Sequence, residues 1–185
     1  MTTTTPSPSA PSRSAGAGPD PSGPPDAAPL WVRLIGPLLP VIPVAGLLIS
    51  GFSQLSGSGK SWQEVFWANS VGWLVGAFMF MGSTPHLVMP GPIARSIGWA
   101  PSPFQWELGA ATLGMAIAGV MASGQPRAFS LAVIIVFSTF MLGAAIGHVR
   151  EMFTQHNFAS GNAGPIFFYD VLAPLVLIYL YVATR

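Results

Sequence analysis

Five long apolar segments follow one another along the 185 residues of this chain, and polar stretches separate them. The segments cover residues 31–52, 62–84, 104–123, 128–149 and 165–183. Each is close to the ~20 residues that an α-helix needs to cross ~30 Å of hydrocarbon. We expect helices because a segment in lipid must satisfy its own backbone hydrogen bonds. The predicted fold class is therefore all-α: an integral membrane helical bundle of about five transmembrane helices.

The regions around these segments complete the predicted domain organisation. Residues 1–29 are rich in Pro, Ser, Thr and Ala and hold almost no large apolar side chain. They cannot offset the entropy of ordering, so we expect a disordered N-terminal tail rather than a signal peptide, followed by a bundle over residues 30–185. Residues 85–103 form the one long connection, whose composition predicts a segment lying along the membrane interface. Several tryptophans lie near predicted span ends, which membrane interfaces favour: Trp31, Trp62, Trp67, Trp99 and Trp106.

The first segment carries three prolines on one side of the expected helix: Pro37, Pro40 and Pro43. Each proline removes a backbone donor and leaves a carbonyl without its helical partner. We favour a kinked span whose backbone groups are satisfied by neighbouring helices. The alternative is that the released carbonyls line a polar cavity.

Composition points to the bilayer and excludes several kinds of chemistry. Only 7% of the residues are charged and 51% are hydrophobic, whereas soluble domains carry about 25% charged residues. The net charge is +1 and the basic residues are scattered, so we expect no nucleic-acid partner. The chain has no cysteine, which excludes disulfides, thiolate metal sites and cysteine nucleophiles.

Two short motifs give little functional information. The stretch SGSGKS at 56–61 resembles the end of a phosphate-binding loop, but the first glycine of that pattern is replaced by Gln54 and no strand precedes it. We therefore expect a flexible turn. The pairs Gly72/Gly76 and Gly143/Gly147 have the GxxxG spacing that lets membrane helices approach closely. They predict tight packing, within the chain or between copies of it.

Polar residues gather at one end of the expected bundle. With five spans, the ends of spans two and four and the starts of spans three and five share one membrane face. That face receives what we call the polar cluster: His86, Glu107, His148, Arg150, Glu151 and Asp170. The opposite face receives little beyond Lys60, Glu64, Arg127 and Arg185.

Three members of the polar cluster lie within spans and should face protein, because a carboxylate in hydrocarbon is costly. Glu107, His148 and Asp170 each share a helix face with small residues, which mark contacts between membrane helices. One interpretation is an interhelical clasp of hydrogen bonds and an ion pair. A second is a proton-handling or ligand site, because a histidine beside buried carboxylates has a perturbed proton affinity. A third is a metal site in which Glu151 joins these three residues. His156 and Asn157 are assigned to a loop, and SGNAGP to a turn before the fifth helix.

Three stretches of the chain carry a resemblance to a known family: SPFQWELGAATLGMAIAG, GHVREM and NFASGNAGPIFFYDVLAP. They resemble an uncharacterised bacterial family of small multi-pass membrane proteins, a domain of unknown function. The bundle is also loosely similar to DoxX-like proteins. The resemblance covers about residues 62–183 and includes Glu107, His148 and Asp170, whereas the tail falls outside it. It implies a four-helix membrane core, preceded here by one N-terminal span. It implies no reaction; the DoxX link implies quinone-coupled sulfur chemistry, for which the chain has no specific signature.

We therefore predict a small structural or accessory subunit of a bacterial inner membrane, with no catalysis of its own and neither cofactor nor metal. The alternative is a proton-linked transporter or a DoxX-like quinone-linked redox subunit that uses the polar cluster. Expected partners are the lipid bilayer and either a second copy or another membrane protein. Basic residues favour the cytoplasmic side, and four of them lie on the N-terminal side against three on the other. We therefore expect a cytoplasmic N-terminus.

Overall fold

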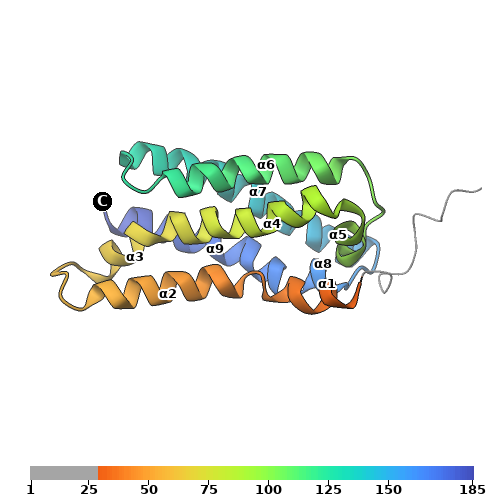
Figure 1. Ribbon diagram of the computed structural model, residues 1–185, viewed down its shortest axis with the longest axis horizontal. Helices are drawn as coiled ribbons and strands as arrows, with labels where there is room; N and C mark the ends of the chain where they lie inside the picture. The colour runs from red at the N-terminus through yellow and green to blue at the C-terminus, as the bar shows by residue number, and fades with distance from the viewer. Residues whose placement is uncertain (1–28) are drawn as a thin grey trace, which may run out of the picture.

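The computed structural model describes residues 29–185, which form a bundle of helical runs joined at alternating ends (Figure 1). No strand occurs in the described part of the chain. The order along the chain is α1 (Leu30–Ile35), η2 (Gly36–Leu38), α2 (Val41–Leu55), α3 (Trp62–Ser70), η3 (Val71–Ala77), α4 (Phe78–Val88), α5 (Pro90–Ile97), α6 (Phe104–Met121), α7 (Arg127–Thr154), α8 (Ser160–Ala163) and α9 (Pro165–Ala183). The tail expected over residues 1–29 lies outside the described residues except for Pro29.

The first predicted span is broken, not only kinked. α1 passes into the 3-10 turn η2, and α2 begins after Pro40. Pro37 and Pro40 cannot donate to the preceding turn, and the Leu39 amide instead bonds the Gly36 carbonyl at 3.2 Å. Two short helical pieces therefore precede α2 at the end of the bundle where α5 and α8 also lie (Figure 1).

The second predicted span is a continuous run of α3, η3 and α4. Its start is fixed by a capping box: the Ser61 hydroxyl accepts from the Glu64 amide, and the Glu64 carboxylate accepts from the Ser61 amide at 2.8 Å. The stretch SGSGKS is thus a loop that ends in a helix cap. η3 is a π-helical segment, and the carbonyl of its Leu74 accepts a 2.8 Å hydrogen bond from the Tyr169 hydroxyl of α9.

The remaining predicted spans match helices, with shifted ends. α7 has 28 residues and continues to Thr154, beyond the predicted end at 149, so GHVREM is helical. α9 covers the predicted 165–183, and α6 ends at Met121. The connection 85–103 holds α5, a short helix that ends at Gly98 with a φ of 85°, a left-handed conformation that glycine adopts without strain.

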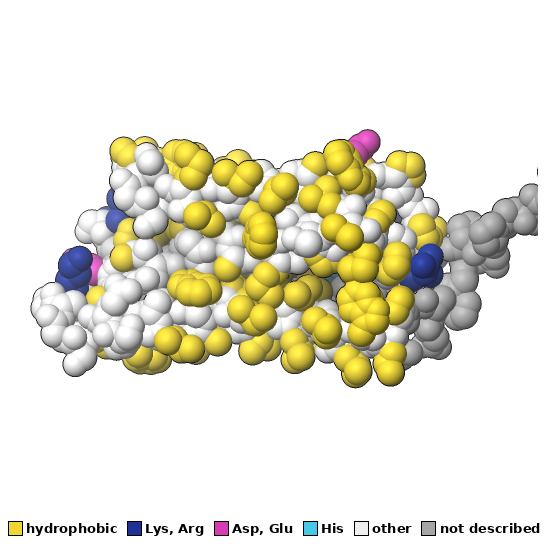
Figure 2. All heavy atoms as spheres, viewed as in Figure 1, with side chains coloured by type: hydrophobic (Ala, Val, Ile, Leu, Met, Phe, Trp, Pro, Cys, Tyr) yellow, Lys and Arg dark blue, Asp and Glu magenta, His cyan; other side chains and the backbone are white. Residues whose placement is uncertain are grey.

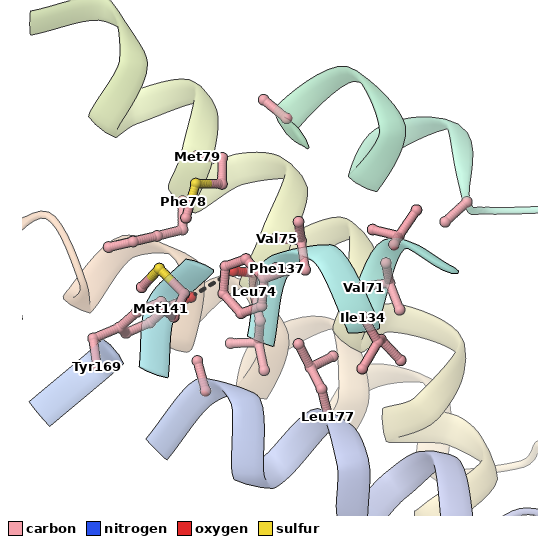
Figure 3. Packing of buried hydrophobic residues seen from close by; sticks show 14 of the residues in the cluster. Val71, Leu74, Val75, Phe78, Met79, Ile134, Phe137, Met141, Tyr169 and Leu177 are labelled. Carbon is pink, nitrogen blue, oxygen red and sulfur yellow. Dashed lines mark hydrogen bonds between the residues drawn. The ribbon is translucent and has the colours of Figure 1, made fainter. Parts of the chain in front are cut away.

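The core lies midway along the bundle, where α7 and α9 meet η3 and α4 (Figure 3). Val75, Phe137 and Leu177 are fully buried there. The rings of Phe78 and Tyr169 stack with centroids 3.9 Å apart, which places aromatic packing beside the Tyr169 hydrogen bond. This core holds α7 and α9 in the alignment that brings their side chains together at the polar end.

Glycine packing is concentrated at one crossing. A Cβ on Gly119 would lie 2.5 Å from the backbone nitrogen of Gly76, so α6 and η3 approach closely at this point. By contrast, Gly72, Gly143 and Gly147 have no atom within 4 Å of such a Cβ. Of the two GxxxG pairs, only Gly76 forms a tight contact in the described residues.

The outer surface of the bundle is apolar along its length. Large hydrophobic side chains cover much of the face in Figure 2, and Lys and Arg appear at its two ends. Four helical runs are long and apolar enough to cross a membrane: Leu30–Leu55, Trp62–Val88, Arg127–Thr154 and Ser160–Ala183. α6 is not among them, although it has 18 residues and runs beside α4.

Candidate functional site

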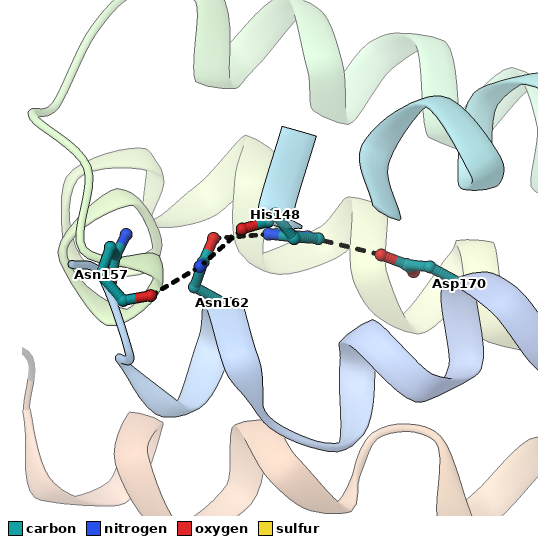
Figure 4. A network of polar contacts seen from close by, with 4 residues as sticks. All are labelled: His148, Asn157, Asn162 and Asp170. Atoms are coloured by element: carbon teal, nitrogen blue, oxygen red, sulfur yellow. Dashed lines mark hydrogen bonds and ion pairs between the residues drawn. The ribbon is translucent and has the colours of Figure 1, made fainter. Parts of the chain in front are cut away.

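A buried histidine and a buried aspartate face each other near one end of the bundle (Figure 4). His148 of α7 and Asp170 of α9 are 6% and 3% exposed, and His148 Nε2 lies 3.4 Å from Asp170 Oδ2. On the other side of the ring, His148 Nδ1 lies 2.6 Å from the Oδ1 atom of Asn162 in α8, a residue with no exposed surface. Three helices therefore contribute one side chain each.

Asn162 fixes which nitrogen of His148 holds the exchangeable proton. Its Nδ2 atom donates to the backbone carbonyls of Asn157 at 2.8 Å and of His148 at 3.3 Å. Its Oδ1 atom is therefore an acceptor, and His148 Nδ1 must donate to it. Nε2 is left to gain or lose a proton beside Asp170. A single proton on this pair gives either an imidazolium with a carboxylate or an imidazole with a carboxylic acid, and both states are neutral overall.

The carboxylate of Asp170 is incompletely satisfied. Its Oδ2 atom is buried and makes no hydrogen bond within the described residues. The 3.4 Å separation from His148 Nε2 is a charge contact, longer than the usual 2.7–3.2 Å hydrogen bond. An unsatisfied buried acceptor typically costs about 1–3 kcal/mol, so a donor brought to this oxygen would be stabilised.

Aromatic and loop contacts position His148 from outside the bundle. The Trp99 ring stacks on the imidazole with centroids 6.2 Å apart and an interplanar angle of 22°. Asn157 donates to the Ile97 carbonyl at 2.9 Å, which ties the loop after α7 to the end of α5. These contacts restrain both the imidazole and Asn162.

A cavity of about 170 Å³ lies inside the bundle next to the pair. His148 and Asp170 line it together with His86, and most of its other walls are apolar. The break in the first span contributes Gly36 and Pro37 to the wall. The break therefore does line a cavity, as the alternative interpretation of the prolines predicted, but that cavity is largely apolar rather than polar.

In the described residues, no other predicted member of the polar cluster makes a hydrogen bond or ion pair with His148 or Asp170, although His86 lines the same cavity. His86 Nδ1 lies 2.8 Å from Gln105 Oε1, so this histidine pairs with the start of α6. Glu151 is half-buried one turn after His148, and Arg150 is exposed. Glu107 is exposed on α6, so the prediction that it points into the bundle beside His148 and Asp170 is wrong.

The exposure of Glu107 also removes the four-ligand metal arrangement considered from the sequence. Within the part of the chain that the structure describes, no three His, Asp or Glu side chains are close enough to hold a metal ion. The arrangement at His148 and Asp170 has the donor and acceptor groups that hydrogen bonding and proton exchange need.

Comparison with known families places most of the chain in one group. Residues 34–185 match the model of a family of unknown function, DUF6790. The chain belongs to this family. The DUF6790 match begins upstream of residue 62, where the resemblance seen in the sequence began, and so includes most of the first span. No curated protein and no solved structure matches the chain, and the DoxX-like resemblance stays a prediction.

Sequence reasoning about this DUF6790 protein missed Asn162 and Trp99. Asn162 was assigned to a turn, but it lies in the one-turn helix α8 and orients His148. An amide side chain between glycines just before an apolar helix was the available signal, since a buried amide must be hydrogen-bonded. Trp99 was assigned only to the membrane interface, and nothing in its sequence neighbours indicates stacking on His148.

Proposed function

We propose that the protein crosses the bacterial inner membrane five times and binds a small, largely apolar molecule with which the His148–Asp170 pair exchanges a proton. This proposal favours the transporter or quinone-linked role over the accessory subunit that composition alone predicts. The observation that carries it is that Asp170, whose buried Oδ2 atom makes no hydrogen bond in the described residues, is among the residues that line the cavity.

Membrane insertion is supported by the four long apolar runs and by large hydrophobic side chains that face outward along them. The chain path supports a fifth crossing. α4 ends at the polar end of the bundle and α7 begins at the opposite end, so α6 must travel the length between them (Figure 1). If its neighbours cross the bilayer, α6 crosses as well.

The cavity limits the ligand to a molecule about the size of one ring. Its volume of about 170 Å³ is similar to that of a ~150 Å³ protein cavity that binds benzene. The apolar walls favour a ring, and the acceptor at Asp170 favours an N–H or O–H group on it. The N–H or O–H group of the ligand would then pass its proton to Asp170 Oδ2, and the reverse transfer would restore that group before the ligand leaves.

Two probes of nearly equal shape test this site: toluene, which cannot hydrogen-bond, and aniline, which can donate. We expect aniline to raise the melting temperature of the detergent-solubilised protein more than toluene does, because only aniline can donate a hydrogen bond to the Asp170 oxygen. Binding at 100 times Kd stabilises a protein by about 2.7 kcal/mol. In Asp170→Leu, which removes the acceptor, the two probes should act equally.

Equal effects of the two probes on the unaltered protein would overturn the proposed ligand site. The proton step is tested in cells with His148→Gln, which can keep a hydrogen bond to Asn162 but cannot take up or release a proton. A variant as stable as the parent that also keeps the phenotype of its host argues for an accessory subunit. Loss of the phenotype at unchanged stability supports proton exchange.

A further inference from the structure

A second cavity is an open groove between the α3–η3–α4 run and α6, with a volume of about 830 Å³. Ligand sites commonly have about 300–1,000 Å³. The groove changes character along its length. Its polar lining residues are Asn69 of α3, Ser123 and Gln125 of the connection between α6 and α7, and Arg127 at the start of α7. Toward the middle of the bundle it is lined by small and apolar residues such as Gly72, Gly76, Ala116 and Ile117.

Arg127 is held in place at the polar end of this groove. Its guanidinium donates to the Tyr181 carbonyl, to the Thr184 carbonyl at 3.1 Å and to the Thr184 hydroxyl at 3.2 Å. It also lies 4.8 Å from the Trp67 ring centroid and 4.4 Å from that of Tyr181. These contacts use three of the five N–H groups of arginine and leave two for a ligand.

A buried hydroxyl in the same groove adds a second polar group. Ser130 is 6% exposed and lines the groove one turn after Arg127. Charge at this end of the bundle has the same sign as Arg127. Lys60, Arg127 and Arg185 lie there with only Glu64 to oppose them among the described residues.

We propose that this groove binds an anionic phospholipid, with the phosphate at Arg127 and an acyl chain along the apolar part toward Gly76. The two N–H groups of Arg127 that remain, one on Nε and one on Nη1, can each donate to a phosphate oxygen, and such charge-assisted hydrogen bonds are about twice as strong as neutral ones. Arg127 begins a candidate span, which is the depth at which a lipid phosphate would lie. The inference rests on the proposed membrane insertion and is independent of the His148–Asp170 site.

A glycine substitution can fill the groove without disturbing its walls. Gly72 lines the groove, and a Cβ on it would have no atom within 4 Å. Gly72→Leu should therefore place its side chain where the acyl chain would lie. Gly143→Leu is the matched control, because Gly143 has equally open space on α7 and does not line the groove. Arg127 variants are less informative alone, because losing the contacts to α9 can unfold the protein.

Native mass spectrometry of the detergent-solubilised protein would measure the bound lipid. We expect phosphatidylglycerol to bind more tightly than phosphatidylcholine, and Gly72→Leu to weaken phosphatidylglycerol by about tenfold while Gly143→Leu leaves it unchanged. Inorganic phosphate should not displace the lipid, since it lacks the acyl chain. Displacement by phosphate would assign the site to free phosphate and overturn the proposal.

Two further results would also overturn it: equal binding of the two lipids, or unchanged binding in Gly72→Leu. His148→Gln separates this inference from the proposed ligand site, because phosphatidylglycerol binding should be unaffected in that variant. Failure of membrane insertion itself would be recognised separately, as extraction of the protein from membranes by alkaline carbonate.

Discussion

The proton state of His148 is set by an asparagine that donates both of its amide hydrogens to backbone carbonyls. Because only the Oδ1 atom of Asn162 remains to face the imidazole, Nδ1 stays protonated in every charge state of the ring. The site therefore directs all proton exchange to Nε2, the atom beside Asp170.

Nitrogen-15 NMR of labelled histidine tests this assignment. We expect the Nδ1 signal of His148 to remain that of a protonated nitrogen across the accessible pH range, while only the Nε2 signal changes. In Asn162→Ala the acceptor is lost, and both neutral tautomers should appear. An Nε2–H tautomer in the unaltered protein would contradict the orientation of Asn162.

Stability should depend far more on Asn162 than on Glu107. Asn162→Leu removes the partners that Asn162 supplies to His148 Nδ1 and to the Asn157 carbonyl, at about 1–3 kcal/mol for each group, so we expect a loss of about 2 kcal/mol or more. Glu107→Leu changes an exposed residue and should stay within about 0.5 kcal/mol. Thermal unfolding in detergent compares the two. Similar losses would show that Glu107 makes a buried contact after all.

The sequence correctly identified His148 and Asp170 at the central site but wrongly added Glu107. The error concerns which face of α6 turns toward the bundle. His148 and Asp170 were identified because polar residues within spans with small neighbours should face protein. Glu107 met the same criteria, but α6 carries small residues on both faces. Gly109 and Gly119 are buried, whereas Ala111 and Gly114 are exposed. Small residues alone therefore could not decide which face of α6 is turned inward.

At the scale of elements, the apolar pattern predicted the existence of the long helices better than their interruptions. The predicted fifth span has the same limits as α9. The break before α2 occurs at Pro37 and Pro40, whereas Pro43 lies within the first turn of α2, so the spacing of the three prolines alone did not show where the helix would break. The π-helical segment η3 has no local sequence signal, since its register depends on contacts such as the Tyr169 hydroxyl with the Leu74 carbonyl.

The close packing of α6 against η3 at the Gly76–Gly119 crossing predicts that a larger residue at position 119 destabilises the protein. A Cβ on Gly119 would lie 2.5 Å from Gly76 nitrogen and 2.8 Å from its Cα, and backbone atoms cannot move aside as a flexible side chain can. We expect Gly119→Ala to lower the free energy of unfolding by about 1–3 kcal/mol through overpacking. The measurement is thermal or denaturant unfolding in detergent.

Gly114→Ala on the same helix is the matched control. No atom lies within 4 Å of its Cβ position, so the substitution should be neutral or stabilise the protein by up to about 1 kcal/mol through reduced backbone entropy of the unfolded chain. If Gly119→Ala is as harmless as Gly114→Ala, the two helices are not in close contact at this crossing.

For the whole molecule, the arrangement of the helices separates the two functional proposals along the bundle axis. The His148–Asp170 pair lines a cavity with residues of η2, α5 and α8, whereas Arg127 donates to Thr184 near the C-terminus, and α5 and the C-terminus lie at opposite ends of the bundle (Figure 1). A ligand at one site therefore makes no direct contact with a lipid at the other. Independent variants at the two sites should consequently show additive effects on stability.

The same arrangement predicts the topology of the chain in the membrane. α1 and the C-terminus lie at opposite ends of the bundle (Figure 1), so a chain inserted as proposed would cross the membrane an odd number of times. Reporter fusions that are active on only one side of the membrane should place the two termini on opposite sides, with the N-terminus in the cytoplasm. A third fusion within residues 122–126 should report the same side as the C-terminus. Termini on one side would rule out five spans.

The direction of insertion rests on a small difference in basic residues, so it should be easy to disturb. The N-terminal side carries Arg13, Arg33, Arg95 and Arg150, and the other side carries the remaining three basic residues. Replacing Arg13 and Arg33 by Gln leaves two against three, so we expect a fraction of the molecules to insert with the N-terminus outside. Replacing Lys60 and Arg185 by Gln should instead strengthen the original orientation. An orientation that neither pair alters would show that the helices themselves, not the basic residues, determine how this chain inserts.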